Sequence, residues 1–330
     1  MAPRRLLGLV VALVTALVSA GCGDDTPTAP SPPPIAALVL QCPANVLGQS
    51  TTGGPVSIQV PAPTASGGVL PVTTSCAPSG TPFPIGTTPV SCRATDARGS
   101  TASCSFSVVV APPPLGRTSF LAFGDSMTSG EVTVPVGTGL DAGGFPLFKL
   151  VVVPSEAYPA ELLGLLRNRY VTQAAQFVVT NAGLPREWAA DAPKRFATVF
   201  PASGAQVVLL MHGSNDLQAL GSRGINPALT GLQTMTRQAR AAGATVFIAS
   251  VPPSRPGGLN SLQLSLIQAL NEQIRLGAPL EGAIFVDVYG AMAADVDTLI
   301  GVDGLHPTEA GYQRIAETFF TAIRSAFEGR

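Results

Sequence analysis

Apolar runs of strand length alternate with helical patterns from residue 117 onward, and this alternation constrains the fold more than any other feature. The strand-like runs lie at 119–123, 176–180, 206–210, 245–250 and 283–288. Amphipathic patterns lie at 160–170, 187–200, 228–243 and 262–274, and a last one extends from about Thr308 to Phe327. The alternation predicts an α/β domain over 117–330, with a parallel sheet covered by helices on both faces. In such sheets ligands bind beyond the carboxyl ends of the strands.

Polar motifs stand at several of those strand ends and before the last helix. They are Gly124–Gly130, Asn181–Gly183, Gly213–Asp216 and Asp303–Pro307. Because the carboxyl ends of parallel strands share one edge of the sheet, these motifs should meet in one crevice.

The residue types in these motifs indicate nucleophilic catalysis. A serine hydroxyl is a weak nucleophile until a neighbouring base takes its proton, and the domain offers His212 and His306 as bases. Asp303 lies three residues before His306, a spacing that lets its carboxylate hold Nδ1 while Nε2 faces a serine. We therefore predict a catalytic triad of Ser126, Asp303 and His306, and we interpret His212 as a structural or rim residue.

An acyl-transfer site also needs donors for the negative charge that develops on the carbonyl oxygen. The backbone N–H groups of Ser126 and Gly183 and the side-chain amide of Asn215 are the predicted oxyanion hole. The acidic residues Asp287, Asp295 and Asp297 lie near Asp303 in the sequence, but their spacing matches no calcium loop. We interpret them as part of a solvated loop and predict no metal site.

The domain resembles the SGNH/GDSL hydrolase superfamily. The matching motifs are FGDSMTSG (123–130), NAGLPREW (181–188), HGSNDL (212–217) and DGLHPTEAGY (303–312), in the order that the superfamily has. The resemblance implies a three-layer α/β/α fold of flavodoxin-like type, a serine ester hydrolase acting through an acyl-enzyme, and no cofactor. Lipids, acetylated glycans and small esters stay equally open as substrates. One departure is Arg186, which stands before Glu187 where related sequences have glycine.

The segment 131–157 separates the serine motif from the first helical pattern. It is apolar and contains glycines. Two interpretations are equally compatible with it: a lid or wall of an acyl pocket, and a surface hairpin packed on the domain.

Residues 36–110 have a different composition, with short β-branched runs between clusters of Gly, Pro, Ser and Thr. Strands are expected at 56–60, 88–92 and 103–110, in a β-sandwich. Four of the five cysteines lie here, at 42, 76, 92 and 104, and they permit three disulfide connectivities. A proline-rich linker follows at 111–116.

This segment resembles the hyalin repeat (HYR) domain. The matching motifs are CP (42–43), CAPSG (76–80), FPIG (83–86), PVSC (89–92), ATD (94–96) and SCSF (103–106). The resemblance implies an immunoglobulin-like sandwich with a role in extracellular adhesion or display, and it favours the pairs Cys42–Cys104 and Cys76–Cys92. The segment is interpreted either as a spacer or as a module that contacts a glycan or a protein.

The first 21 residues have the order of a secretory signal peptide: Arg4 and Arg5, an apolar run from Leu6 to Ala20, then small residues. The sequence VSAGC (18–22) resembles a bacterial lipobox, which implies lipidation of Cys22. Residues 22–35 then form a lipidated cysteine and a proline-rich tether. The expected location is outside the cytoplasm, anchored to the bacterial membrane or cell surface.

The net charge of −1, with 12% charged residues, provides no basic surface for phosphates, so nucleic-acid binding is disfavoured. An alternative to the esterase is an adhesion or display lipoprotein whose hydrolase domain is inactive. Because every predicted site residue is present, the esterase is the favoured hypothesis.

Overall fold

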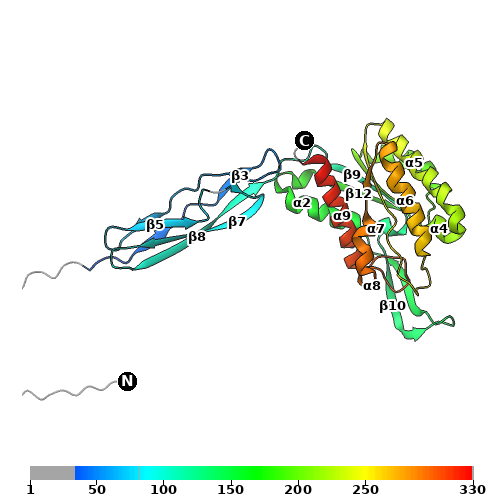
Figure 1. Cartoon of the computed structure of the whole chain (residues 1–330), viewed down its shortest axis with the longest axis horizontal. Helices are drawn as coiled ribbons and strands as arrows, with labels where there is room; N and C mark the ends of the chain where they lie inside the picture. The colour runs from blue at the N-terminus through cyan, green and yellow to red at the C-terminus, as the bar shows by residue number, and fades with distance from the viewer. Residues whose placement is uncertain (1–33, 81, 329–330) are drawn as a thin grey trace, which may run out of the picture.

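The computed structural model describes residues 34–80 and 82–328, which form an elongated molecule with a β domain at one end and an α/β domain at the other (Figure 1). The expected signal peptide and Cys22, and all but the last residues of the expected tether, lie outside the described residues. Within the described part, no helix is long and apolar enough to cross a membrane.

A four-stranded sheet organises the β domain. Its order is β2 (Val46–Gln49), β8 (Thr101–Ala111), β7 (Gly86–Thr95), β5 (Thr73–Ala77). Two small sheets pair β1 (Val39–Gln41) with β4 (Thr64–Ser66) and β3 (Val56–Ser57) with β6 (Pro82–Phe83). Leu40 and Phe83 from these small sheets pack with Val90, Phe106 and Val108 of β7 and β8. The alternating buried residues of β7 and β8 therefore build one core face, as the β-rich sequence predicts.

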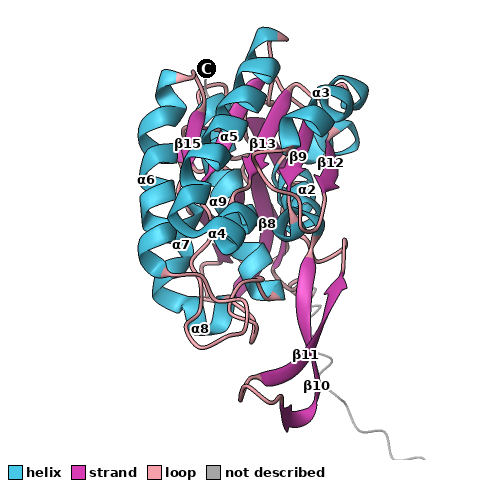
Figure 2. Cartoon of the chain, turned by 90° about the vertical axis from the view of Figure 1, so that its right-hand side faces the viewer, coloured by secondary structure: helices cyan, strands magenta, loops and turns pink. Residues whose placement is uncertain are grey.

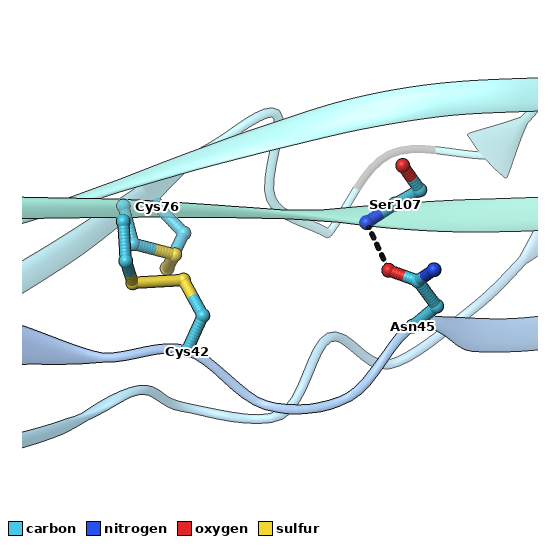
Figure 3. The surroundings of a disulfide bond; sticks show 6 residues. Cys42, Asn45, Cys76 and Ser107 are labelled. Carbon is cyan, nitrogen blue, oxygen red and sulfur yellow. Dashed lines mark hydrogen bonds between the residues drawn. A yellow bond between two sulfur atoms is a disulfide. The ribbon is translucent and has the colours of Figure 1, made fainter.

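Both disulfides lie at the same level of this sheet. They join Cys42 to Cys104 and Cys76 to Cys92, which is the pairing that the HYR resemblance implies. Cys76 and Cys104 each lie opposite Cys92 across a strand pair. Close to the Cys42 bridge, the side chain of Asn45 accepts a hydrogen bond from the Ser107 N–H at 2.9 Å (Figure 3). The Cys42–Cys104 bridge and this bond hold the β1–β2 segment on the sheet, and the Cys76–Cys92 bridge joins β5 to β7 within it.

The α/β domain contains a five-stranded parallel sheet. Its order is β12 (Val178–Gly183), β9 (Ser119–Gly124), β13 (Val207–Met211), β14 (Thr245–Ala249), β15 (Ile284–Val286). Counted from β9, this is the 2-1-3-4-5 order of the flavodoxin-like doubly wound fold. After β9 the chain adds β12 on one side, and then β13, β14 and β15 on the other. The switch point therefore lies where β9 meets β13.

Helices cover both faces of this sheet, so the expected three-layer architecture is confirmed (Figures 1 and 2). Side chains of α2 (Tyr158–Arg169), α7 (Val288–Met292) and α9 (Glu309–Phe327) share one buried cluster with Phe120 and Ala122 of β9. Side chains of α3 (Ala192–Ser203), α5 (Ile225–Ala241) and α6 (Leu264–Leu280) share the other with Leu121 and Phe123. The alternate residues of β9 thus point into opposite layers, as strand geometry requires.

Short elements complete the domain. They are α1 (Ser126–Ser129), α4 (Ser214–Leu220), α8 (Val296–Leu299), and the 3₁₀ turns η1 (Val171–Gln176), η2 (Gly221–Gly224) and η3 (Ala293–Asp295). The segment 131–157 contains an antiparallel hairpin of β10 (Glu131–Leu140) and β11 (Pro146–Val152), and this hairpin projects from the body of the domain (Figure 2).

The linker after β8 is anchored on the α/β domain. Leu115 is buried in the same cluster as α2 and α9. Its N–H and C=O both bond the side-chain amide of Gln173, at 2.8 and 3.1 Å. Leu115, near the end of the linker, is therefore fixed on the α/β domain by burial and by two hydrogen bonds.

Candidate active site

The serine motif forms a tight turn between β9 and α1. Asp125 caps this short helix, because its side chain accepts a hydrogen bond from the Met127 N–H at 3.0 Å. The helix ends at Gly130, whose left-handed φ of 92° reverses the chain toward β10. Ser126 is the first residue of the helix, so its N–H has no acceptor within the helix.

The loop before α9 brings the predicted base and acid to that serine. The Ser126 Oγ lies 2.9 Å from the His306 Nε2, and the His306 Nδ1 lies 2.6 Å from the Asp303 Oδ2. All three residues are buried, with 0 to 4% of their surface exposed. The distances and the order of the groups are those of a Ser–His–Asp triad.

Asp303 is held in place by its own loop and by a residue that the sequence analysis did not identify. Its Oδ1 accepts the N–H groups of Leu305 and His306 at 3.1 Å each, and its Oδ2 accepts the Asn260 amide at 3.0 Å. Burial alone would raise the pKa of Asp303, but these hydrogen bonds and the imidazole lower it below its usual value. The acid is therefore ionised at neutral pH.

His306 has a second carboxylate beside it that the sequence analysis also missed. The Glu131 Oε2 lies 3.2 Å from the His306 Nε2, the same nitrogen that faces Ser126. Burial would lower the pKa of His306, but the hydrogen bonds to Asp303 and Glu131 outweigh it and raise this pKa to about 9. Glu131 follows the serine motif directly, yet no spacing rule marks it.

Asn215 lies at the start of α4, next to the serine turn. The neighbouring Ser214 Oγ donates to the Asp125 Oδ2 at 2.8 Å, which ties the amino ends of α4 and α1 together. The Asn215 Nδ2 donates one hydrogen to the Glu187 carbonyl at 2.9 Å. An amide nitrogen carries two hydrogens, so the second is available to a ligand.

Gly183 lies against the backbone of the serine turn. Its N–H donates to the Asn181 Oδ1 at 3.0 Å and so is already satisfied within its own loop. The position needs glycine for packing, because a Cβ there would lie 2.1 Å from the Ser129 N. In this arrangement Gly183 brings β12 close to α1, and its role in an oxyanion hole stays a prediction.

A buried ionic network supports the loop that follows Gly183. The Glu187 carboxylate pairs with Arg195 and accepts a bond from the His212 ring at 3.1 Å. Arg195 also donates to the Ala182 carbonyl at 2.9 Å, and its guanidinium lies 3.9 Å from the Phe123 ring centroid. His212 has no exposed side-chain surface, so its place is structural.

The solvated acidic residues do not gather into a cation site. Asp287 caps α7 through the Gly290 N–H, and Asp297 pairs with Arg255. Within the parts of the chain that the structure describes, the sole group close enough to share a metal is Cys42, Cys92 and Cys104, whose sulfurs are committed to disulfides.

The fold and the site together define a doubly wound α/β protein with a Ser–His–Asp array at its topological switch point. The model of the GDSL-like lipase/acylhydrolase family matches residues 122–314, and the chain belongs to that family. It is therefore a hydrolase that acts on esters. The HYR domain model matches residues 32–110, ahead of the hydrolase.

The chain is also similar to several solved structures. An alpha/beta hydrolase enzyme from the metagenome of Lake Arreo is 19% identical, with 63% of this chain and 95% of that chain covered and a TM-score of 0.50. A lipase/acylhydrolase from Enterococcus faecalis is 21% identical, with 64% and 98% covered and a TM-score of 0.48. At such identities the likeness concerns the fold alone. No curated protein was found to match the chain.

Proposed function

We propose that this hydrolase is a serine esterase that forms an acyl-enzyme on Ser126 outside the cytoplasm. The observation that carries the chemistry is the chain of contacts from the Ser126 Oγ through His306 to Asp303, at 2.9 and 2.6 Å. Proton transfer needs donor and acceptor within this range, and with a neutral His306 ring these two contacts meet that requirement.

The steps follow from these positions. Ser126 attacks the ester carbonyl while its proton passes to the His306 Nε2, and Asp303 stabilises the imidazolium through Nδ1. The free N–H of Ser126 and the second amide hydrogen of Asn215 bind the oxyanion. The imidazolium then gives its proton to the leaving alcohol. Water, activated by the same imidazole, releases the acid and restores Ser126.

The first test is hydrolysis of p-nitrophenyl esters with acyl chains of two to sixteen carbons. The natural chain should turn over at least part of the series, and Ser126→Ala should reduce turnover to background. Ser129→Ala is the matched control, because it removes from the same short helix a hydroxyl that donates to the Ser126 carbonyl, and it leaves the Ser126 Oγ in place. The best chain length distinguishes an acetyl esterase from a lipid acylhydrolase.

A serine-directed fluorophosphonate probe gives an independent readout. The wild-type chain and Ser129→Ala should be labelled, and Ser126→Ala should not. An unlabelled and inactive wild-type chain that is nevertheless folded would reject the esterase in favour of the display hypothesis.

The oxyanion hole has its own test. Asn215→Ala should lower kcat by about 100- to 1000-fold with a smaller change in KM, because the lost donor acts on the transition state. A loss below tenfold would remove Asn215 from this role.

The proposal of export and lipid anchoring is supported by the sequence and the disulfides, and not by the geometry of the active site. The basic, apolar and small-residue order of residues 1–22 favours a lipoprotein signal, and two disulfides suit an oxidising compartment. Cells grown with labelled palmitate should incorporate the label into the chain and not into Cys22→Ser. Equal labelling of the two would refute the anchor.

A further inference from the structure

Glu131 occupies a place beside the nucleophile that the steps above do not use. It is the first residue of β10, immediately after the glycine that ends α1. Its backbone is fixed, because the Tyr312 hydroxyl of α9 donates to the Glu131 carbonyl at 2.6 Å. Its side chain is 15% exposed, and its carboxylate lies 3.2 Å from the His306 Nε2. Among residues 34–80 and 82–328, no lysine or arginine pairs with this carboxylate.

Two groups therefore share one imidazole nitrogen. In a neutral His306 whose Nδ1 proton is given to Asp303, the Nε2 carries a lone pair. A lone pair accepts a hydrogen bond from the Ser126 hydroxyl, but it repels a carboxylate oxygen. In the imidazolium, Nε2 carries a hydrogen that both the Ser126 Oγ at 2.9 Å and the Glu131 Oε2 at 3.2 Å can accept. The 3.2 Å contact between the Glu131 carboxylate and Nε2 therefore favours the protonated ring over the neutral one.

The charges around the ring agree with this. Asp303 faces Nδ1 from the loop before α9, and Glu131 faces Nε2 from β10. The next acid, Asp125 beneath the serine turn, is engaged by the Ser214 hydroxyl. The third neighbour, Tyr312, presents a neutral hydroxyl. The pKa of His306 is accordingly raised to about 9.

We propose that Glu131 is a positioning residue that holds His306 as an imidazolium in the resting enzyme and stabilises the imidazolium formed during turnover. This inference rests on the proposed function, since it assigns Glu131 a part in the same proton transfer. The Ser126 proton moves to Nε2 as the bond from Oγ to the carbonyl carbon forms, and it leaves with the alcohol. Glu131 acts on the imidazole ring alone and takes no part in these transfers.

The consequence is an enzyme whose turnover rises as the pH becomes alkaline. Only the neutral ring can accept the Ser126 proton, so at neutral pH a small fraction of the molecules is ready to react. Each unit by which the pKa of His306 exceeds the ambient pH lowers that fraction about tenfold. Removing the Glu131 charge should therefore increase turnover at neutral pH and decrease the alkaline plateau, because the base becomes weaker.

The decisive measurement is the titration of His306 by NMR of the imidazole carbons in the full chain. The sequence contains just two histidines, so His306→Gln assigns the signal. The titration midpoint should lie near 9 in the natural chain and should fall by one unit or more in Glu131→Gln. Glu131→Asp, with a shorter side chain, should lie between them. Glu309→Gln removes an exposed charge three residues from His306 and should leave the midpoint unchanged.

The pH profile of kcat/KM on p-nitrophenyl acetate provides the second readout, with Ser126→Ala as the background. The acidic limb should move with the NMR midpoint in each variant. An unchanged midpoint in both Glu131 variants would overturn the inference while leaving the esterase intact. A midpoint that falls as expected in a chain without serine-dependent turnover would keep the Glu131–His306 pairing and reject the proposed function.

Discussion

At the scale of single residues, the backbone of Arg186 is the clearest local conflict. Its φ is 66°, and it is the one non-glycine residue with a positive φ in the described part of the chain. The left-handed region brings Cβ close to the following carbonyl, at a cost of about 1–2 kcal/mol. The next residue, Glu187, anchors Asn215 through its carbonyl and Arg195 through its carboxylate. These contacts fix the loop in a shape that suits glycine better than arginine.

Arg186→Gly should therefore stabilise the hydrolase domain by about 1 kcal/mol, because glycine adopts the left-handed region without the Cβ clash. Urea unfolding followed by far-UV circular dichroism measures the change. Arg186→Ala is the control, since it removes the side chain and keeps the strain. If both variants changed stability equally, the effect would belong to the arginine side chain.

The protonation of His306 gives a second prediction at this scale. Its pKa is about 9 in the folded chain and about 6.5 as a free side chain, so the folded state holds the proton more tightly. The resulting stability is fully present below pH 6.5 and is lost as the pH rises through about 9. The free energy of unfolding of the hydrolase domain should fall by about 3 kcal/mol over this interval.

Urea midpoints at pH 6, 7.5 and 9.5 would measure that decrease. The matched chain is His306→Gln, which has no imidazole and should show a flatter dependence over the same pH values. Parallel curves for the two chains would mean that other groups cause the loss.

At the scale of elements, the sequence predicts the strands and helices of the α/β domain well, because the pattern of buried apolar residues determines where they form. The strand-like runs of the α/β domain match β9, β12, β13, β14 and β15 within a few residues. The last helix begins where expected, since the Thr308 side chain caps it through the Gly311 N–H. The run at 56–60 is less regular, because only Val56–Ser57 pair, with the short strand β6.

The candidate site is only partly predictable, and the reason is the same for each missed residue. Ser126, Asp303 and His306 belong to one loop or one strand end each, so motif and spacing locate them. Asn260 reaches Asp303 from a loop distant in sequence. Glu131 follows the serine motif, but only the fold brings its carboxylate to His306. The predicted donor role of Gly183 rests on its position at a strand end and on the motif NAG (181–183). The bond to Asn181 that satisfies this N–H could be found only from coordinates.

The β10–β11 hairpin carries an element-scale prediction. Val136, Leu140 and Leu147 are 41 to 64% exposed, and the hairpin begins at Glu131 beside the nucleophile. Replacing 136–147 with Asn-Gly would close the hairpin at the cross-strand pair Pro135–Phe148. We expect unchanged stability and acetyl ester turnover, because the exposed tip adds little to the core.

Turnover of esters with long acyl chains should fall by tenfold or more in the same variant if the acyl chain extends along the exposed apolar side chains of this hairpin. The ratio of long-chain to acetyl kcat/KM is the measurement. An unchanged ratio would favour a surface hairpin over a lid or acyl wall.

At the scale of the whole molecule, the two domains differ in how they are stabilised. The hydrolase has two large apolar clusters and no cysteine, whereas the small β core is reinforced by two cross-links. A cross-link stabilises chiefly by restricting the unfolded chain, and more so when it closes a longer loop. The two bridges close loops with sequence separations of 62 and 16 residues.

Loss of Cys42–Cys104 as a double serine variant should therefore cost about 1 kcal/mol more than loss of Cys76–Cys92. Calorimetry of the β-domain transition gives the two values. Hydrolysis of p-nitrophenyl acetate should be unaffected in both variants, because neither bridge touches the α/β domain. Loss of that activity would show that the β domain supports the hydrolase.

The order of the triad along the chain has a consequence for biosynthesis. Ser126 and His306 are 180 residues apart, and the strand that carries the serine is an inner strand whose neighbours follow it in the sequence. During synthesis Ser126 therefore emerges long before His306. Strand β9 can pair only after its two neighbours, β12 and β13, have been synthesised. A nascent or truncated chain that stops before residue 303 presents a serine hydroxyl with no group to activate it. Under the proposed mechanism, ester cleavage therefore requires a chain that extends at least to His306 and has folded around it.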